Sequence, residues 1–203
     1  PARLALLLGN ETYADAVGRL KNPKNDVRVV GEALKKIGFK DPTIRTDQKR
    51  SQILNAVNQF ASRLADAGAG AIGFLYYSGH GAAEPGGATN YLIPTDATDP
   101  TTAEFWYSSV KLDEVTRILR ERAPNAAHFV VFDACRNELK LPDKTPGKGF
   151  AAVPQLSGMF VAFATDPGRT ASDAGVTSGP YAAALAANII KPGLAHWDVF
   201  QNV

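Results

Sequence analysis

The sequence predicts an α/β fold, a three-layer sandwich in which helices cover both faces of a mostly parallel central sheet. Three observations support this. Strand-like and helix-like segments alternate along the 203 residues. Residues 71–77 are continuously apolar, as in a parallel strand covered on both faces. The helical segments between strands are long enough for the crossovers that parallel strands need. We therefore expect residues 1–203 to form a single domain.

The first half of the chain supplies three strands and two helices. Apolar residues recur at helical spacing after residue 25, and Gly38 follows them as a stop signal. A second periodic segment opens at Ser51 and ends before Gly68. The elements expected here are strands at 3–9, 43–46 and 71–77 and helices at 25–37 and from Ser51 onward.

The second half continues the alternation. A stretch with one proline and two glycines predicts a hairpin tip at 84–89. Residues 139–149 hold three lysines, two prolines and two glycines and predict an exposed loop between a larger part, about 1–138, and a smaller part, about 150–203. The elements expected here are strands at 91–93, 128–132 and 158–164 and helices at 112–122 and 180–190.

Composition narrows the function classes. The net charge is +2, and no basic block stands out, so we expect no nucleic-acid partner. No apolar run is long enough to span a bilayer. The single cysteine excludes an internal disulfide. The chain begins in a strand and ends in a helical segment, so we expect a piece of a longer protein with other domains. We expect it to be a soluble monomer, cytoplasmic or periplasmic in a bacterium.

The only cysteine and one of three histidines follow two of the predicted strands. His80 comes after residues 71–77, and Cys135 comes after residues 128–132. Ligands of open α/β sheets bind outside the carboxyl ends of the strands. The 55 residues between His80 and Cys135 leave room for a hairpin and one crossover helix between neighbouring parallel strands.

This placement favours acyl transfer. A lone cysteine is usually a small buried hydrophobe, and a lone histidine is usually structural. Equivalent positions on adjacent strands make both readings weaker. Gly81 offers an unhindered N–H beside His80, and with the N–H of Cys135 it would form an oxyanion hole. A thiol nucleophile, a histidine base and two such donors are the set that Cys–His acyl transfer requires.

Other chemistries fit the sequence less well. A cysteine phosphatase needs Arg six residues after the cysteine, where Leu141 stands. A serine hydrolase elbow needs Gly two residues before Ser78, where Tyr76 stands. The first strand is followed by no glycine-rich phosphate loop. The three histidines lack a second ligand at metal-binding spacing, so zinc is not expected.

At these residues the sequence resembles the caspase-like cysteine peptidases, most closely their metacaspase and bacterial orthocaspase branch. Residues 77–81 (YSGHG) are similar to the histidine motif of that family, and residues 133–137 (DACRN) to its cysteine motif. Residues 4–13, 20–27 and 164–168 resemble further family segments. The resemblance covers nearly the whole chain and implies a cysteine endopeptidase with a caspase/hemoglobinase-like fold.

The resemblance also implies a specificity. In metacaspases the pocket for the residue before the cleaved bond is acidic and binds Arg or Lys. The matching positions here are Asp26, Ser78 and Asp133. Carboxylates in a concave site pair well with guanidinium or ammonium groups. The alternatives are an acid at a helix start for Asp26 and a turn residue for Asp133. Peptide and protein substrates with Arg or Lys before the cut are thus the expected partners.

Two further family features are weaker here. Members are often cut in the region that matches residues 139–149, which makes Lys140, Lys144 and Lys148 candidate self-cleavage sites; a solvated basic loop is the alternative. Many metacaspases need calcium, and Asp113 and Glu114 match an acidic pair of the family. The acidic loop that often follows the histidine motif in the family is replaced here by residues 82–90, in which Glu84 is the only acidic residue. We expect no required cofactor, with calcium as an open alternative.

Three functions remain for comparison. The first is hydrolysis after Arg or Lys through a thioester. The second is a caspase-like pseudo-enzyme that acts as a binding or scaffold module, which the presence of both His80 and Cys135 disfavours. The third is a flavodoxin-like nucleotide-binding domain, which shares the architecture but would need a phosphate cradle.

Overall fold

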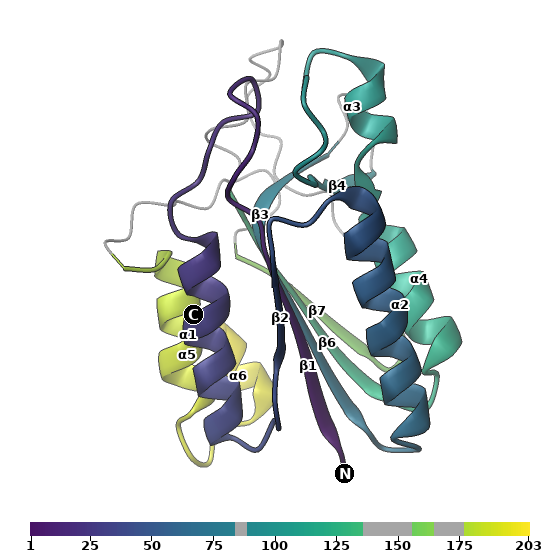
Figure 1. The fold of residues 1–203 in the computed structure, drawn as a ribbon. Coiled ribbons are helices and arrows are strands. Elements are labelled where there is room, and N and C mark those ends of the chain that lie inside the picture. The colour runs from purple at the N-terminus through teal and green to yellow at the C-terminus, as the bar shows by residue number, and fades with distance from the viewer. Residues whose placement is uncertain (84–88, 136–155, 165–176) are drawn as a thin grey trace.

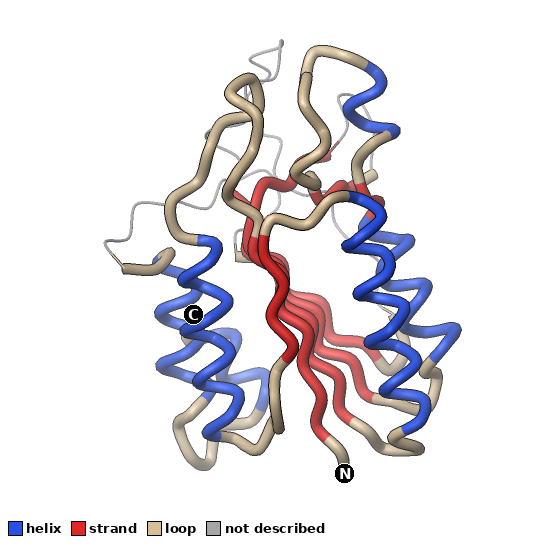
Figure 2. Tube along the Cα trace, in the orientation of Figure 1, coloured by secondary structure: helices blue, strands red, loops and turns tan. Residues whose placement is uncertain are grey.

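The computed structural model describes residues 1–83, 89–135, 156–164 and 177–203, and of Cys135 it describes the backbone. Figures 1 and 2 show a central sheet with helices on both sides. The strands are β1 (Arg3–Gly9), β2 (Thr43–Thr46), β3 (Ile72–Ala83), β4 (Asn90–Leu92), β5 (Val110–Lys111), β6 (Ala127–Cys135) and β7 (Met159–Phe163). The helices are α1 (Pro23–Lys36), α2 (Arg50–Asp66), α3 (Ala103–Tyr107), α4 (Leu112–Arg122), α5 (Pro180–Ile189) and α6 (His196–Gln201).

The sheet is mostly parallel, as the sequence predicts. Strands β2, β1, β3, β6 and β7 lie side by side in that order, and each neighbouring pair is parallel. Strands β4 and β5 extend the sheet from the carboxyl end of β3. The pairing of β3 with β4 and that of β4 with β5 are both antiparallel. In the described part of the chain, α1 connects β1 to β2, α2 connects β2 to β3, and α4 precedes β6, which explains the alternation in the sequence.

Two apolar layers fix the helices to the sheet. On one face, α2 and α4 pack against alternate residues of β1, β3 and β6, such as Leu75 and Val130. On the other face, α1, α5 and α6 cover the opposite set, such as Tyr76 and Val131. Figure 1 shows α1, α5 and α6 together on the left of the sheet and α2 with α4 on the right. The predicted three-layer sandwich is confirmed.

Two strands run further than their apolar patterns predict. β3 continues through the polar and glycine-rich residues 78–83, and β6 continues to Cys135. The pairing explains the difference, because residues 78–80 of β3 hydrogen-bond to β6 and residues 81–83 pair with β4. His80 therefore lies inside a strand rather than after one. The short elements α3 and β5 were not predicted, and of the predicted hairpin tip residues 84–88 lie outside the described residues.

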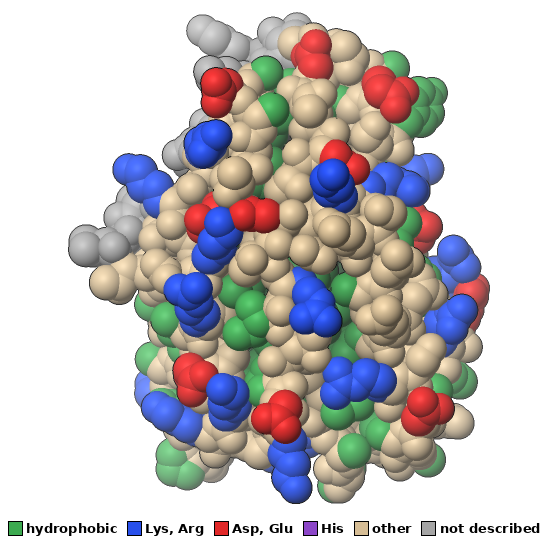
Figure 3. All heavy atoms as spheres, viewed as in Figure 1, with side chains coloured by type: hydrophobic (Ala, Val, Ile, Leu, Met, Phe, Trp, Pro, Cys, Tyr) green, Lys and Arg blue, Asp and Glu red, His purple; other side chains and the backbone are tan. Residues whose placement is uncertain are grey.

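The surface is mixed in charge. On the face drawn in Figure 3, Lys and Arg side chains are interspersed with Asp and Glu. Among the described residues, no helix is both long and apolar enough to cross a membrane.

The contact between β1 and the start of α1 depends on a glycine. A Cβ added at Gly9 would lie 2.6 Å from the carbonyl oxygen of Pro23 and 3.1 Å from Cγ1 of Val27. Since Pro23 contributes backbone, the helix itself would have to move. We expect Gly9→Ala to lower the free energy of unfolding by about 2 kcal/mol, the usual cost of overpacking a core, as measured by urea denaturation.

Gly31→Ala is the matched control for this effect. Gly31 lies within α1, and its added Cβ would be 3.4 Å from Cδ1 of Ile44, an ordinary contact. Alanine favours helix over glycine by about 1 kcal/mol, so this variant should be no less stable than the unaltered protein. Equal stability of the two variants would show that the approach of β1 to α1 is not tight.

Candidate active site

The candidate site lies at the carboxyl edge of β3 and β6. The parallel register makes His80 the partner of Cys135 and Ser78 the partner of Asp133. Cys135 is the last residue of β6. Because side chains alternate along a strand, residues 76, 78 and 80 of β3 belong to the face that α1 and α5 cover. The register thus brings the only cysteine of the chain and His80 to neighbouring strands at the same level.

His80 is completely buried, and its peptide group is held by two tyrosines. Its backbone N–H donates to the hydroxyl of Tyr13 at 3.0 Å. The hydroxyl of Tyr77 donates to the carbonyl oxygen of His80 at 2.8 Å. The ring of Tyr13 also packs on the imidazole, with centroids 4.6 Å apart. The imidazole therefore has a fixed position before any substrate arrives.

The imidazole is also oriented by the loop between β1 and α1. Nε2 of His80 lies 2.8 Å from the carbonyl oxygen of Gly18. A carbonyl oxygen only accepts hydrogen bonds, so Nε2 must carry the hydrogen. In the neutral ring the lone pair then resides on Nδ1, which is the nitrogen able to act as a base.

Gly79 is required by the same arrangement. A Cβ at this position would lie 2.6 Å from the hydroxyl oxygen of Tyr77 and 2.7 Å from that of Tyr13. Gly81 follows His80 and pairs with Leu92 of β4. The two glycines beside His80 therefore serve different purposes. Gly79 leaves space for the hydroxyls of Tyr13 and Tyr77, and Gly81 lies where the pairing of β3 changes from β6 to β4.

A buried carboxylate connects α1 to both the sheet and the start of α5. Asp26 is 3% exposed. Its Oδ2 accepts a hydrogen bond from the hydroxyl of Ser78 at 2.8 Å, and its Oδ1 accepts one from the N–H of Gly179 at 2.7 Å. Gly179 directly precedes α5. Asp26 thus joins the first helix to a segment 153 residues later in the chain.

A second buried carboxylate lies beside the first. Asp133 is 5% exposed and is the register partner of Ser78. Its Oδ2 accepts a hydrogen bond of 2.7 Å from the hydroxyl of Tyr76. Burial, with the charge of Asp133 as a second cause, raises the pKa of Tyr181 in α5. The structure therefore brings Asp26, Ser78 and Asp133 into one cluster.

The loop that carries Gly18 is anchored by a charged network at the end of β2. Asp47 accepts hydrogen bonds from the backbone N–H groups of Glu11 and Thr12 at 3.1 and 2.9 Å. Nζ of Lys24 lies 2.6 Å from Oδ2 of Asp47 and 3.1 Å from Oε1 of Glu11. Partial burial would raise the pKa of Asp47, but the hydrogen bonds from Lys24 and the two N–H groups outweigh it and lower this pKa.

This network should make stability depend on pH in the acid range. A carboxylate with a lowered pKa in the folded state contributes stability that is complete above its unfolded pKa and lost as the pH falls through the folded pKa. We expect Asp47→Asn to cost about 1–2 kcal/mol at pH 7, typical for hydrogen bonds to a charged group. The difference from the unaltered protein should shrink toward pH 3, measured by urea denaturation at each pH.

Asp15→Asn is the control for a general charge effect. Asp15 pairs with Arg19 at 3.9 Å, but its side chain is 98% exposed. Exposed pairs of this kind contribute little, so this variant should follow the pH curve of the unaltered protein. A constant difference between Asp47→Asn and the unaltered protein from pH 7 to pH 3 would contradict a role for the Asp47 charge.

Other predicted site residues lie elsewhere. Asp113 and Glu114 occupy the first turn of α4, where acids stabilise a helix, and Glu114 lies 3.7 Å from Arg50. Within the described residues no group of three His, Cys, Asp or Glu side chains could hold a metal ion. The candidate self-cleavage sites Lys140, Lys144 and Lys148 lie outside the described residues, as do Glu84 and residues 165–168.

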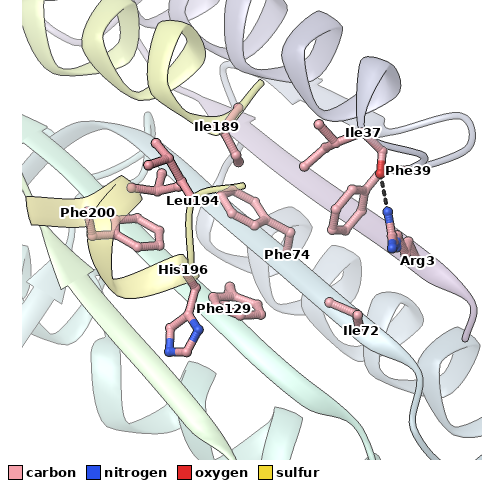
Figure 4. A pocket seen from close by; sticks show the side chains of 11 residues that line it. Arg3, Ile37, Phe39, Ile72, Phe74, Phe129, Ile189, Leu194, His196 and Phe200 are labelled. Carbon is pink, nitrogen blue, oxygen red and sulfur yellow. Dashed lines mark hydrogen bonds between the residues drawn. The ribbon is translucent and has the colours of Figure 1, made fainter. Parts of the chain in front are cut away.

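An apolar pocket of about 220 Å³ lies at the opposite end of the sheet. Figure 4 shows its aromatic wall, with Phe74, Phe129 and Phe200, and the hydrogen bond from Arg3 to the carbonyl oxygen of Ile37. Arg3 and Ile72 in its lining begin β1 and β3, whereas His80 and Cys135 lie toward the other ends of their strands. This pocket is separate from the candidate site.

Sequence reasoning missed several contributors to the site, among them the side chains of Tyr13 and Tyr76 and the carbonyl of Gly18. Tyr76 could have been found, because it lies two residues before Ser78 and therefore on the same face of the strand. Tyr13 and Gly18 lie 67 and 62 residues from His80, in a loop without periodicity. No local pattern indicates those two contacts.

Comparison with known proteins agrees with the fold and identifies the family. A solved structure, protein GSU0716 from Geobacter sulfurreducens, is similar at a TM-score of 0.64 and 17% sequence identity, over 91% of this chain and 80% of that chain. That likeness concerns the fold alone. A search of curated proteins finds no match. The caspase domain family model of the C14 peptidases matches residues 2–203. The chain therefore belongs to the caspase-domain family of cysteine peptidases.

Proposed function

We propose that this chain is a cysteine endopeptidase that hydrolyses peptide bonds after Arg or Lys, within the metacaspase and orthocaspase branch of the family. The observation that supports this most is the register of β3 and β6. It pairs His80 with Cys135 two residues beyond the pair of Ser78 and Asp133. His80 and the acidic cluster therefore lie close together at one edge of the sheet, with the backbone of Cys135 beside His80.

The proposed reaction uses His80 as the base and Cys135 as the nucleophile. Nδ1 of His80 takes the proton of the Cys135 thiol, and the thiolate attacks the carbonyl carbon of the scissile bond. The N–H groups of Gly81 and Cys135 stabilise the oxyanion that forms. The intermediate collapses to a thioester, and the leaving amine takes the proton from His80. Water, deprotonated by His80, then attacks the thioester and releases the acid and the thiol.

The proposed specificity rests on two buried carboxylates beside the reacting pair. Asp26 and Asp133 are both nearly inaccessible to water, and Ser78 lies between their elements. An Arg or Lys side chain would bring the positive charge that two buried carboxylates favour. An Asp side chain in the same place would be repelled.

Reporter peptides that differ in the residue before the leaving group test this function. We expect release from Arg- and Lys-ended reporters and none from Asp- or Ala-ended ones. Because the chain has a single cysteine, one equivalent of iodoacetamide should abolish the activity. Cleavage of Asp-ended reporters alone would overturn the specificity, and no cleavage of any reporter, with or without added calcium, would favour the scaffold alternative.

Mapping cut sites in a mixed peptide library extends this test to self-processing. New termini after Lys140, Lys144 or Lys148 are expected if the chain cuts itself, and they should be missing from a Cys135→Ala sample. Cuts at those lysines in the Cys135→Ala sample would point to a contaminating protease.

A further inference from the structure

The pocket carboxylates are supported by neutral hydrogen-bond donors. Asp26 receives the Ser78 hydroxyl and the Gly179 N–H, and Asp133 receives the Tyr76 hydroxyl. Burial disfavours the charged form of a carboxyl group, while hydrogen bonds to that form favour it. The donors therefore decide whether a buried pocket of this kind stays negative while no substrate occupies it.

Tyr76 is the donor with the most restricted environment. Its side chain is completely buried within the apolar layer that α1 and α5 cover. Burial is the first cause that raises the pKa of Tyr76 well above its usual range, and the charges of Asp133 and Asp26 add to it. The hydroxyl is therefore protonated at neutral pH. Since a carboxylate only accepts, Tyr76 is the donor to Asp133.

The register shows from which side this donor approaches. Tyr76 pairs with Val131, two residues deeper along the strands than the pair of Ser78 and Asp133. The pair of His80 and Cys135 lies two residues further toward the carboxyl edge. The Tyr76 hydroxyl therefore reaches Asp133 from the core side, and His80 lies toward the other side of that residue.

We propose that Tyr76 is a positioning residue of the specificity pocket, whose hydroxyl holds the Asp133 carboxylate charged and in one orientation for the Arg or Lys of the substrate. This inference rests on the proposed function, because it concerns the same pocket. Within the described part of the chain, the ionisable groups near Asp133 include Tyr76 from β3, Asp26 from α1 and Tyr181 from α5. Of these, Tyr76 makes the direct hydrogen bond.

Tyr76→Phe tests the proposal, because it removes the hydroxyl and keeps the ring. Without the donor the pKa of Asp133 should rise, because a hydrogen bond to its charged form is lost. The rise of KM for an Arg-ended reporter on acidification should then begin about one pH unit higher than in the unaltered protein. The value of kcat should stay within about twofold, since the reacting pair is untouched.

Two controls separate this effect from a general loss of packing. Tyr77→Phe removes another fully buried hydroxyl, one that bonds to the backbone oxygens of His80 and Ile93. It should lower the free energy of unfolding without changing the pH at which KM begins to rise on acidification. In an Asp133→Asn background, Tyr76→Phe should have no further effect on KM, because Tyr76 acts through Asp133. The proposal is overturned if KM of Tyr76→Phe begins to rise at the same pH as that of the unaltered protein. It is also overturned if Tyr76→Phe changes KM in the Asp133→Asn background as much as it does alone.

A titration of the unaltered protein decides the case if the variant does not fold or the reporters are not cleaved. With aspartate carbons labelled with ¹³C, the carboxyl signal missing from Asp133→Asn should be that of an ionised carboxyl at neutral pH, in line with a donor that favours the charged form. A protonated Asp133 carboxyl at neutral pH overturns the proposal. Failure of the unaltered protein to cleave Arg- or Lys-ended reporters counts against the proposed function instead, and this titration still tests whether the Asp133 carboxyl is held in its charged form.

Discussion

Cleavage of an Arg-ended reporter is expected to fall at least about 10³-fold when either His80 or Cys135 is replaced by alanine, and by no more when both are replaced. A nucleophile and its base work as a unit, so losing one leaves the other without a partner. The parallel register makes these two residues direct partners on β3 and β6. The measurement is kcat/KM for the two single variants and the double variant.

The reason for expecting so much from His80 is how firmly it is held. Its imidazole receives a ring contact from Tyr13, and its Nε2 is fixed by the Gly18 carbonyl. A base that is already oriented loses little freedom when it takes up the proton. An alanine at this position removes that oriented base.

His128→Ala is the matched control. His128 is also a buried histidine, and its Nε2 also bonds to a backbone carbonyl, that of Ala123 at 2.9 Å. It lies at the start of β6, whereas Cys135 lies at the end. This variant should lose stability but keep its activity per folded molecule. If His80→Ala retained activity, or if the double variant were far worse than either single one, the two residues would not form a catalytic pair.

The strands and helices could be predicted where one physical signal dominates. β1 and α4 have the bounds that their apolar patterns predict, because β1 is buried on both faces and α4 buries one clear face. β3 was predicted too short, because apolar residues end at Tyr77 while the backbone goes on pairing through Ala83. Pairing with β4 and β6 is a tertiary property, and a run of serine, glycine and histidine does not reveal it.

The position of the candidate residues on the sheet could be predicted, but their contacts could not. The placement of His80 and Cys135 at one edge follows from their positions near the carboxyl ends of parallel strands, which the alternating pattern predicts. The bond from Gly179 to Asp26 joins segments 153 residues apart, and the supporting bond from Tyr76 to Asp133 crosses between strands. Such contacts depend on how the layers pack, and no local periodicity encodes them.

Asp26→Asn is expected to lower kcat/KM for Arg-ended reporters by about 100-fold or more while leaving the fold intact. The amide keeps an oxygen that can accept the Gly179 N–H, so the link between α1 and α5 survives. What is lost is a buried negative charge, and removing one partner of such a pair typically costs about 2–5 kcal/mol in binding. The loss should be in KM and should be measured with Arg- and Lys-ended reporters.

Asp26→Ala separates the charge of this residue from its structural bonds. It would leave the buried N–H of Gly179 without an acceptor, at a cost of about 1–3 kcal/mol, so urea denaturation should show a loss of stability that Asp26→Asn lacks. Glu32→Gln, an exposed acid on the same helix, should change neither activity nor stability. Suppose that Asp26→Asn kept the KM of the unaltered protein while Asp26→Ala had a lower free energy of unfolding. Asp26 would then be a structural residue that connects α1 to α5, and it would not belong to the specificity pocket.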